Sequence, residues 1–398
     1  MTLPDEVDIL IVGGGPAGLA AAAELAPHRR VLVLEREPEA GGIPRHCGHY
    51  PFGMREFHRL MRGPDYARAL VARAQAAGAR IATRVDVTAL HPGPAVSVTG
   101  DAGVARISAL HVLLATGVRE SSRVQRLIGG EKPGGVLPTG ALQGMVYLEG
   151  RRPFRNPVIF GSELVSFSAI MTCRHAGIRP VAMIEEEPRA IARWPAAIYP
   201  RLHGIPLHLS TRIAAIEGRE RVEAVVVEGP AGQQRIEADG VIVSGRFRPE
   251  ATLLAGSHLA RDAGTGGPRI DRRGRCSDPG FLAAGNLLRA AETAGWCWAE
   301  GRAVARALLA GEEAPQAVEI TPEGDALAWV VPQVAGAGGG LDRIQIGLAR
   351  PARGHLSLRQ NGVEIASRRI DSRPKRRILM SLPQVTGDAP LTLHLEER

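Results

Sequence analysis

The sequence of 398 residues contains few cysteines and few aromatic residues. Its four cysteines, Cys47, Cys173, Cys276 and Cys297, lie far apart, so the CxxC spacing of a redox pair, a zinc site or many iron–sulfur clusters is missing. We therefore expect no metal site. Aromatic residues make up 4% of the chain and do not alternate with the scattered arginines, so the net charge of +8 indicates a basic surface and no nucleic-acid site.

Long apolar runs and targeting signals are missing as well. No run of 18 or more apolar residues suggests a membrane span. The first residues, MTLPDEVDIL, lack the basic segment of a secretory signal. We therefore expect a cytoplasmic protein with reduced thiols, long enough for two or three domains.

A dinucleotide-binding turn is the clearest motif in the chain. Residues 7–25, VDILIVGGGPAGLAAAAEL, read as an apolar strand, a glycine turn and an alanine-rich helix. In this fingerprint Gly13 permits the tight turn, Gly15 lets a pyrophosphate approach the backbone, and Gly18 lets the helix pack on the strand. The helix N-terminus then offers free N–H groups to the phosphates.

Further segments resemble the two-dinucleotide-binding-domain flavoproteins, the superfamily of pyridine nucleotide–disulfide oxidoreductases. Glu35 ends a second strand at the spacing of a ribose-binding carboxylate. Two later apolar strands are each followed by a glycine turn, at Thr116-Gly117 in HVLLATGVRE and at Gly285-Asn286 in FLAAGNLLRA. A helix follows the second of these turns. The resemblance implies that the late turn binds the ribityl chain, although Asn286 stands where the family usually has Asp. It also implies that the helix N-terminus faces the flavin pyrimidine, where its positive end stabilises anionic reduced flavin.

This resemblance predicts FAD as the cofactor. The residues that we assign to FAD binding are Gly13, Gly15, Pro16, Ala17, Gly18, Glu35, Arg36, Gly42, Ile43, Val87, Ala115, Thr116, Gly117, Gly285, Asn286, Thr293 and Ala294. Residues 8–310 are more closely similar to the FAD subunits of multi-subunit opine, amine, proline and glycerol-3-phosphate dehydrogenases and of hydrogen cyanide synthase, in motifs such as PGGVLPTGALQ and GSELVSFSA. This similarity implies two partners, a small iron–sulfur protein and a second flavoprotein dehydrogenase subunit. It also implies a small amine, imino acid or hydroxy-acid-type metabolite as the substrate.

A second glycine turn follows the strand Val158–Phe160 and differs from the first. Gly161 is kept, but Glu163 and Ser166 occupy the places of the second and third glycines. A carboxylate at position 163 would block and repel a pyrophosphate. We therefore predict that the shell of a dinucleotide site is retained and that NAD(P)H is not a working substrate.

The fold class expected is α/β, with two Rossmann-like dinucleotide-binding domains, the second inserted in the first, and a small C-terminal all-β domain. The predicted domains are the first part of the FAD-binding domain at 1–122, an inserted NAD(P)-binding-like domain at 123–245, the second part of the FAD-binding domain at 246–315, and a β-sandwich-like domain at 316–398. The last contains no cluster of titratable residues, so we expect it to serve assembly.

Catalytic candidates lie in RHCGHYPFG, which we expect to face the flavin. Cys47 is either a redox thiol activated by His46 and His49, or a buried small side chain whose neighbouring histidines line a wall or an interface. The function predicted is electron transfer within a multi-subunit dehydrogenase. The alternatives are a self-sufficient NAD(P)H-dependent flavin reductase and a non-catalytic FAD-holding scaffold.

Overall fold

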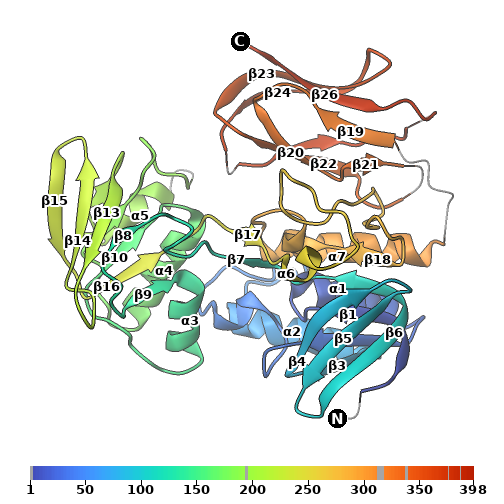
Figure 1. Ribbon diagram of the computed structural model, residues 1–398, viewed down its shortest axis with the longest axis horizontal. Helices are drawn as coiled ribbons and strands as arrows, with labels where there is room; N and C mark the ends of the chain where they lie inside the picture. Colours follow the sequence, from blue (N-terminus) through green and yellow to red (C-terminus); the bar gives the residue numbers. More distant parts are fainter. Residues whose placement is uncertain (1–2, 193–195, 312–317, 337–338, 375, 386) are drawn as a thin grey trace.

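The computed structural model describes residues 3–192, 196–311, 318–336, 339–374, 376–385 and 387–398. Three bodies are visible in Figure 1: a sheet with helices that carries the N-terminus, a second α/β body made of the middle of the chain, and a group of C-terminal strands. Among the helices in these described ranges, none is both long and apolar enough to cross a membrane.

The first body is built on one sheet that has a parallel and an antiparallel part. The sheet order is β3-β2-β1-β6-β5-β4, and β18 pairs with β6 on the side of its C-terminal half. The long strand β6 therefore belongs to both parts: its first residues are antiparallel to β5, and its last residues are parallel to β1 and β18. The strands are β1 Glu6–Val12, β2 Val31–Glu35, β3 Arg80–Thr83, β4 Val85–His91, β5 Ala95–Gly100, β6 Gly103–Leu114 and β18 Phe281–Ala283.

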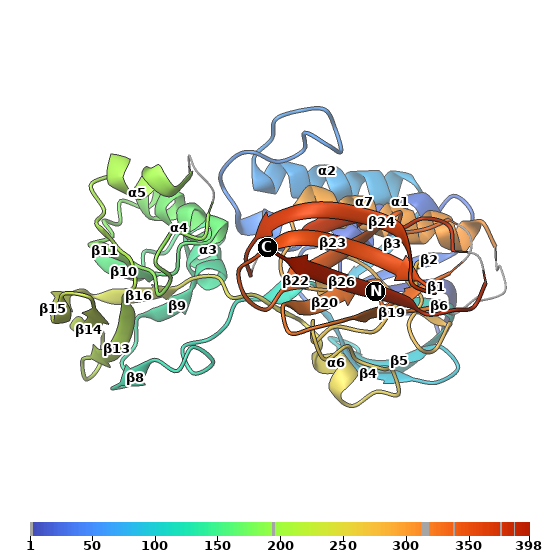
Figure 2. The same ribbon diagram turned by 90° about the horizontal axis from the view of Figure 1, so that it is seen from above.

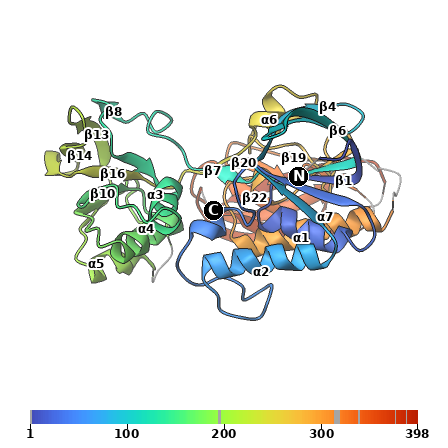
Figure 3. The ribbon, with the colours of Figure 1, turned by 90° about the horizontal axis from the view of Figure 1, so that it is seen from below.

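Helices α1 Pro16–Leu25, α2 Gly63–Ala76 and α7 Ala294–Leu309 cover this sheet (Figure 3). A Cβ atom on Gly301 of α7 would lie 2.1 Å from the carbonyl oxygen of Ala17 in α1. The two helices therefore touch through their backbones, although they are almost 300 residues apart in the chain. The short helices are η1 Ile43–His46, α6 Thr252–Ala255 and η3 Gly285–Leu287.

The middle of the chain repeats the same plan. A parallel sheet has the order β12-β11-β10-β16-β9, and an antiparallel meander, β15-β14-β13, packs beside it together with β8. Two short strands, β7 and β17, pair antiparallel where the chain enters and leaves this body. The elements are β7 Val118–Arg119, β8 Gly129–Gly130, β9 Val136–Pro138, α3 Thr139–Tyr147, β10 Pro157–Phe160, α4 Leu164–His175, β11 Ala182–Ile184, η2 Ala196–Ile198, α5 Tyr199–Leu202, β12 Leu207–His208, β13 Arg212–Glu217, β14 Ala224–Gly229, β15 Gly232–Glu237, β16 Gly240–Val243 and β17 Arg248–Pro249.

The C-terminal strands form two sheets around one core. The orders are β21-β19-β26-β23-β24 and β20-β22-β25, and apolar side chains from both sheets share a single cluster. Asn361 and Gly362 have φ angles of 50° and 78° and make the predicted hairpin turn between β23 and β24. The strands are β19 Val318–Pro322, β20 Leu327–Val331, β21 Val334–Ala335, β22 Arg343–Leu348, β23 Ala352–Gln360, β24 Val363–Ser372, β25 Ile378–Ser381 and β26 Leu391–Glu397.

The C-terminal strands rest on the first body (Figure 2). Arg272 donates to the backbone carbonyl oxygens of Leu382 and Pro383, each over 3.0 Å. The side-chain oxygen of Gln333 accepts from the backbone N–H of Ile270 over 2.9 Å. The predicted boundary between residues 315 and 316 lies outside the described residues.

Candidate functional site

The three predicted glycines of the turn between β1 and α1 lie in different surroundings. A Cβ on Gly13, whose φ is 109°, would lie 2.4 Å from the Ala115 carbonyl oxygen, and a Cβ on Gly18 would lie 2.0 Å from the Gly13 carbonyl oxygen. Both positions therefore exclude a side chain for reasons of packing. A Cβ on Gly15 would meet only Gly42 Cα, at 4.0 Å, so this glycine keeps open space beside the helix N-terminus.

The chain that leaves β2 folds over this turn and is held there by Glu35. This carboxylate is buried and accepts backbone N–H groups of Gly14 over 3.0 Å and of Glu37 over 2.9 Å. The Gly41 N–H donates to the Gly14 carbonyl oxygen over 2.7 Å, which places Gly42 next to Gly15. We call Gly13, Gly15, Gly18, Glu35 and Gly42 the first cradle.

The wall opposite the first cradle is formed by segments that lie far from the glycine turn in the sequence. Gly285, with a φ of 77°, lies against α1, since a Cβ on it would be 2.7 Å from the Cβ of Ala17. Thr116 donates to the carbonyl oxygen of Glu250 over 2.7 Å, and Gly117 has a φ of 78°. Helix α7 begins after Thr293 beside this wall.

Other predicted cofactor residues lie around the cradle at different depths. Pro16 is the first residue of α1, Ala294 is the first of α7, and Ala115 ends the β6 side of the turn. Ile43 is 52% exposed and Arg36 is exposed, so both side chains are open to a ligand. Val87 lies half-buried in β4, on the antiparallel part of the sheet.

The side chain of Asn286 is already engaged within its own loop. Its Nδ2 donates to the Glu292 carbonyl oxygen over 3.1 Å, and its Oδ1 accepts from the Glu292 N–H over 2.6 Å. This pair of bonds shapes the chain that leads into α7. The amide oxygen keeps one lone pair for another donor, so a ribityl contact stays a prediction.

The residues of the first cradle fit FAD. Two positions require glycine because a side chain would clash, one position leaves the backbone open next to a helix N-terminus, and the buried carboxylate of Glu35 accepts a backbone N–H of the turn. This is the arrangement that binds a dinucleotide pyrophosphate through backbone N–H groups and the helix dipole.

A second cradle, formed by Gly161, Glu163, Ser166 and Glu185, repeats this geometry. A Cβ on Gly161, whose φ is 114°, would lie 2.6 Å from the Ser244 carbonyl oxygen, as Gly13 lies against Ala115. Glu185 is buried and accepts the Glu187 N–H over 3.0 Å, as Glu35 accepts Glu37. The scaffold of a dinucleotide turn is thus present twice.

The second cradle is filled by the protein's own charged side chains. The carboxylate of Glu163 accepts the Arg246 N–H over 2.8 Å and covers Gly245, where a Cβ would lie 2.6 Å from Glu163 Cδ. Glu186 forms ion pairs with Arg246 and, over 3.3 Å, with Arg126. A carboxylate therefore occupies the position at which the first cradle is open.

Arg126 comes from the segment that links the two bodies and is buried over β10. Its Cζ lies 4.0 Å from the ring centroid of Phe160, and it donates to the Ser244 carbonyl oxygen over 3.2 Å. Nothing in the local sequence marks this arginine as a core residue, and we did not predict it. It covers Phe160, the last residue of β10.

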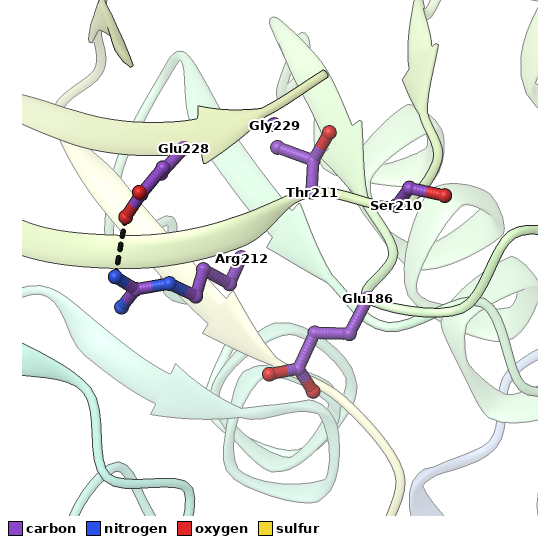
Figure 4. A pocket seen from close by; sticks show the side chains of 6 residues that line it. All are labelled: Glu186, Ser210, Thr211, Arg212, Glu228 and Gly229. Carbon is purple, nitrogen blue, oxygen red and sulfur yellow. Dashed lines mark hydrogen bonds and ion pairs between the residues drawn. The ribbon is translucent and has the colours of Figure 1, made fainter. Parts of the chain in front are cut away.

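A shallow hollow lies beside Glu186 (Figure 4). Its volume is about 350 Å³, and it is lined by Glu186, Ser210, Thr211, Arg212, Glu228 and Gly229. Two of these residues, Arg212 and Glu228, form an ion pair with each other. The hollow lies in the middle body and is separate from the first cradle.

The predicted catalytic residues lie between the two α/β bodies. Cys47 is buried and donates to Gln143 Oε1 over 3.5 Å; Gln143 donates to Ser168 Oγ over 2.7 Å; and Ser168 Oγ contacts His49 Nε2 at 2.5 Å. These contacts therefore link Cys47 of the first body to Gln143 in α3, then to Ser168 in α4, and return to the first body at His49. His46 is half-buried, and its Nδ1 is shielded from solvent with no hydrogen-bond partner within the described residues.

Electrostatics at this contact disfavour a thiolate. Burial, followed by the nearby carboxylate of Glu120, raises the pKa of Cys47 to about 12. Burial and then the neighbouring Arg45 lower the pKa of His46. The geometry therefore fits the alternative in which Cys47 is a buried small side chain and the histidines line an interface.

Glu120 joins the two bodies, and no pattern in the sequence marks it. Its two oxygens accept the N–H groups of Gly140, over 2.7 Å, and of Gly245, over 3.0 Å. Burial raises the pKa of this carboxyl, while the two backbone donors lower it. Glu120 therefore fixes the first turn of α3 to the segment that returns to the first body.

A stack of charged and aromatic groups surrounds the first turn of α7. The Trp296 ring centroid lies 4.1 Å from Arg55 Cζ and 4.4 Å from Arg377 Cζ. Below it, buried Arg289 pairs with Glu300, and Gln345 of the C-terminal strands contacts both residues. Trp296 therefore packs between cations.

No cluster of three or more His, Cys, Asp or Glu side chains is placed to hold a metal ion in the ranges that the structure covers.

Comparisons with known proteins agree on the fold and on the type of cofactor site. The family model described as pyridine nucleotide-disulphide oxidoreductase matches residues 7–302.

The A subunit of opine oxidase from Rhizobium meliloti (strain 1021) is 28% identical over 269 residues, which are 65% of this chain and 56% of that protein. The A subunit of opine oxidase from Agrobacterium tumefaciens (strain Ach5) is 30% identical over 322 residues, which are 71% of this chain and 62% of that protein. The chain therefore spans less than two thirds of the length of these relatives.

Solved structures show the same fold. Thioredoxin reductase of T. acidophilum has a TM-score of 0.64 at 21% identity, and the match covers 77% of this chain and 99% of that one. L-Proline dehydrogenase from P. horikoshii has a TM-score of 0.60 at 22% identity, and the match covers 77% of this chain and 55% of that one. These likenesses confirm the α/β part of the predicted fold class.

Proposed function

The chain belongs to the pyridine nucleotide-disulphide oxidoreductase family, and from that premise we propose that it is the FAD subunit of a multi-subunit dehydrogenase. It is an FAD-dependent oxidoreductase. The substrate that we propose is a small amine, imino acid or hydroxy-acid-type metabolite. One observation carries the proposal: the first cradle is open at Gly15, whereas Glu163 fills the corresponding position of the second.

The first cradle supplies binding and orientation to the cofactor. The turn at Gly13, Gly15 and Gly18 would take the pyrophosphate, and Glu35 would face the adenosine ribose. Bound FAD would supply two-electron redox chemistry at its flavin ring. Helix α7 begins beside the wall of the cradle, and its positive N-terminal end favours negative charge at the site.

The closed second cradle means that electrons need another route. A nicotinamide cofactor would have to displace the Glu163 carboxylate and break the pairs of Glu186 with Arg126 and Arg246. A partner protein is the simplest such route, and we propose a second flavoprotein dehydrogenase subunit together with a small iron–sulfur protein.

The names of the relatives support a partner. Both opine oxidase relatives are named as subunits. The alpha subunit of sarcosine oxidase from Rhizobium meliloti (strain 1021) is 26% identical over 258 residues, which are 61% of this chain and 24% of that protein. Relatives that work as parts of larger oxidases favour the same arrangement here.

Two other functions make different predictions. A self-sufficient NAD(P)H-dependent flavin reductase agrees with the fold of the thioredoxin reductases but requires an open second cradle. A non-catalytic FAD-holding scaffold would keep the cofactor without any redox turnover.

Anaerobic mixing of the purified flavoprotein with NADH or NADPH separates the first alternative. We expect no fast, saturable bleaching of the flavin absorbance, and such bleaching would establish the reductase.

Co-expression with the proteins encoded beside this chain tests the subunit proposal. We expect a stoichiometric complex by native mass measurement, and dye reduction with N-substituted amino acids or hydroxy acids that the isolated chain does not support. Full turnover by the isolated monomer would contradict the proposal. A complex whose activity survives removal of this chain's flavin would favour the scaffold.

A further inference from the structure

A hairpin at residues 52–61 projects from the first body beside α2 (Figures 2 and 3). Phe52 and Met61 close it with two backbone hydrogen bonds of 3.0 and 2.9 Å. We name this segment hairpin 52–61. It follows the loop that holds Cys47 and precedes helix α2, so it is attached to rigid structure at both ends.

The inner side of hairpin 52–61 is anchored. Phe52 and Phe57 pack against the buried Tyr66 of α2, with ring centroids 5.5 and 6.1 Å apart. Glu56 is buried and accepts the Tyr66 hydroxyl over 2.7 Å. The aromatic rings and the one carboxylate of the segment therefore face the protein, and they fix the orientation of the outer side.

The outer side carries cations and apolar side chains together. Met54 is 58% exposed and Leu60 is 56% exposed, and Arg55, Arg59 and His58 are exposed beside them. Neither arginine has an ion pair with a carboxylate within the described parts of the chain. Exposed apolar side chains beside guanidinium groups that lack a carboxylate partner are typical of protein–protein interfaces, in which Arg and Met are enriched.

Hairpin 52–61 also touches the element that leads to the first cradle. Arg55 stacks on Trp296 in the first turn of α7, and Glu56 Oε1 would lie 3.0 Å from a Cβ on Gly295. A protein bound on the hairpin would therefore contact the helix that begins beside the predicted flavin. A partner at this place would lie close to the predicted flavin.

We propose that hairpin 52–61 is the docking surface for the redox partner protein, and that the partner offers an acidic face with an apolar groove for Met54 and Leu60. This inference rests on the proposed function and makes its partner surface specific. The loop RHCGHYPFG, at residues 45–53, is the other candidate surface near the predicted flavin. Hairpin 52–61 fits the docking role better, because Cys47 and His49 of that loop are engaged in contacts with α3 and α4. Charge complementarity favours an acidic protein, and the inward-facing phenylalanines leave no aromatic wedge for a lipid surface.

The test uses the full chain co-expressed with the proteins encoded beside it. The variant Arg59→Glu with Leu60→Asp reverses one charge and removes one apolar contact on the hairpin. The matched control is Arg106→Glu with Val104→Asp on β6, where Val104 is 82% exposed and Arg106 is exposed. Both variants are first checked for wild-type FAD content.

We expect the hairpin variant to bind the partner protein at least tenfold more weakly and the control to bind as the wild type does. Wild-type affinity should fall when the salt concentration is raised, because the contact is electrostatic. A photo-crosslinking residue at Met54 should attach to the partner, and the same residue at Val104 should not.

Three results would overturn the inference. Wild-type binding by the hairpin variant refutes the docking surface while leaving the subunit proposal in place. Absence of any stoichiometric partner for the wild type refutes both proposals. Binding of the wild type to vesicles of anionic phospholipid that the hairpin variant loses, with the protein complex unaffected, assigns the hairpin to a membrane surface instead.

Discussion

Replacing Glu163 tests whether one side chain closes the second cradle. Its carboxylate accepts the Arg246 N–H over 2.8 Å at the position where the first cradle has Gly15. A unit charge about 4 Å from a phosphate oxygen at an effective dielectric constant of about 20 repels it by about 4 kcal/mol. At about 1.4 kcal/mol per tenfold change, this corresponds to an affinity about a thousandfold lower.

We expect Glu163→Gln to remove the charge and Glu163→Gly to remove both the charge and the bulk. NADH should therefore bind Glu163→Gln up to about a thousandfold more tightly than the wild type, and Glu163→Gly at least as tightly as Glu163→Gln. Calorimetric titration gives the dissociation constants, and anaerobic stopped-flow mixing shows whether bound NADH reduces the flavin. Glu187→Gln is the control, because that carboxylate is exposed beyond the end of β11. Equal, undetectable binding by all four proteins would refute the reasoning.

Further predictions concern the first cradle, the contact between the bodies and the C-terminal strands. Gly15→Val should fill the open position and give colourless protein, whereas flavin content equal to the wild type in the absorbance spectrum would remove the cofactor assignment. The Cys47 thiol should titrate near a pKa of about 12 by its absorbance at short wavelength, and Cys47→Ser should keep dye-linked turnover; a thiolate present at neutral pH would restore the redox role. Because burial lowers the pKa of His46, the folded protein resists protonation there, so stability should be lost as pH falls below about 6.5; His46→Gln should reduce this loss in thermal unfolding at a series of pH values. Arg289→Met should leave Glu300 buried without its cation and lower stability by about 3 kcal/mol, and an unchanged melting temperature would contradict this.

Local patterns in the sequence predict the first cradle well. Gly13, Gly15 and Gly18 are close together in the chain, and the φ of 109° at Gly13 and the contact of Gly18 with the Gly13 carbonyl oxygen arise inside one strand–turn–helix unit. Glu35 follows at a spacing that the same unit fixes. These positions can be predicted because the glycine spacing is local, although the contact of Gly13 with Ala115 is long-range in the sequence.

Long-range partners escape such patterns. Arg126 looks like a surface residue in a loop, yet it is buried because Phe160, Ser244 and Glu186 are brought to it from later parts of the chain. Glu120 is similar, since its partner Gly245 follows 125 positions later. The sequence does predict that Glu163 prevents nucleotide binding at the second turn. It does not predict that the Glu163 carboxylate accepts the N–H of Arg246.

The Asn286 side chain shows how a predicted contact depends on neighbours. From the sequence alone an amide at this place is free to bind a ribityl chain. In the structure it is bonded twice to the backbone of Glu292, because the loop before α7 folds back on it. The pattern identified the residue, and the fold decided its partner.

The backbone contacts between α1 and α7 also set an order of events during synthesis. Ala17 is made early, but Gly285 and Gly301, which pack against it, follow only after the whole middle body. Strand β18 joins β6 at the same late stage. Since domains fold as units while the chain grows from its N-terminus, the middle body can fold first, and the nascent first body must wait with an incomplete wall. Cofactor capture is therefore a late event, and a ribosome that stalls before residue 285 releases a chain that has its glycine turn but cannot enclose its flavin.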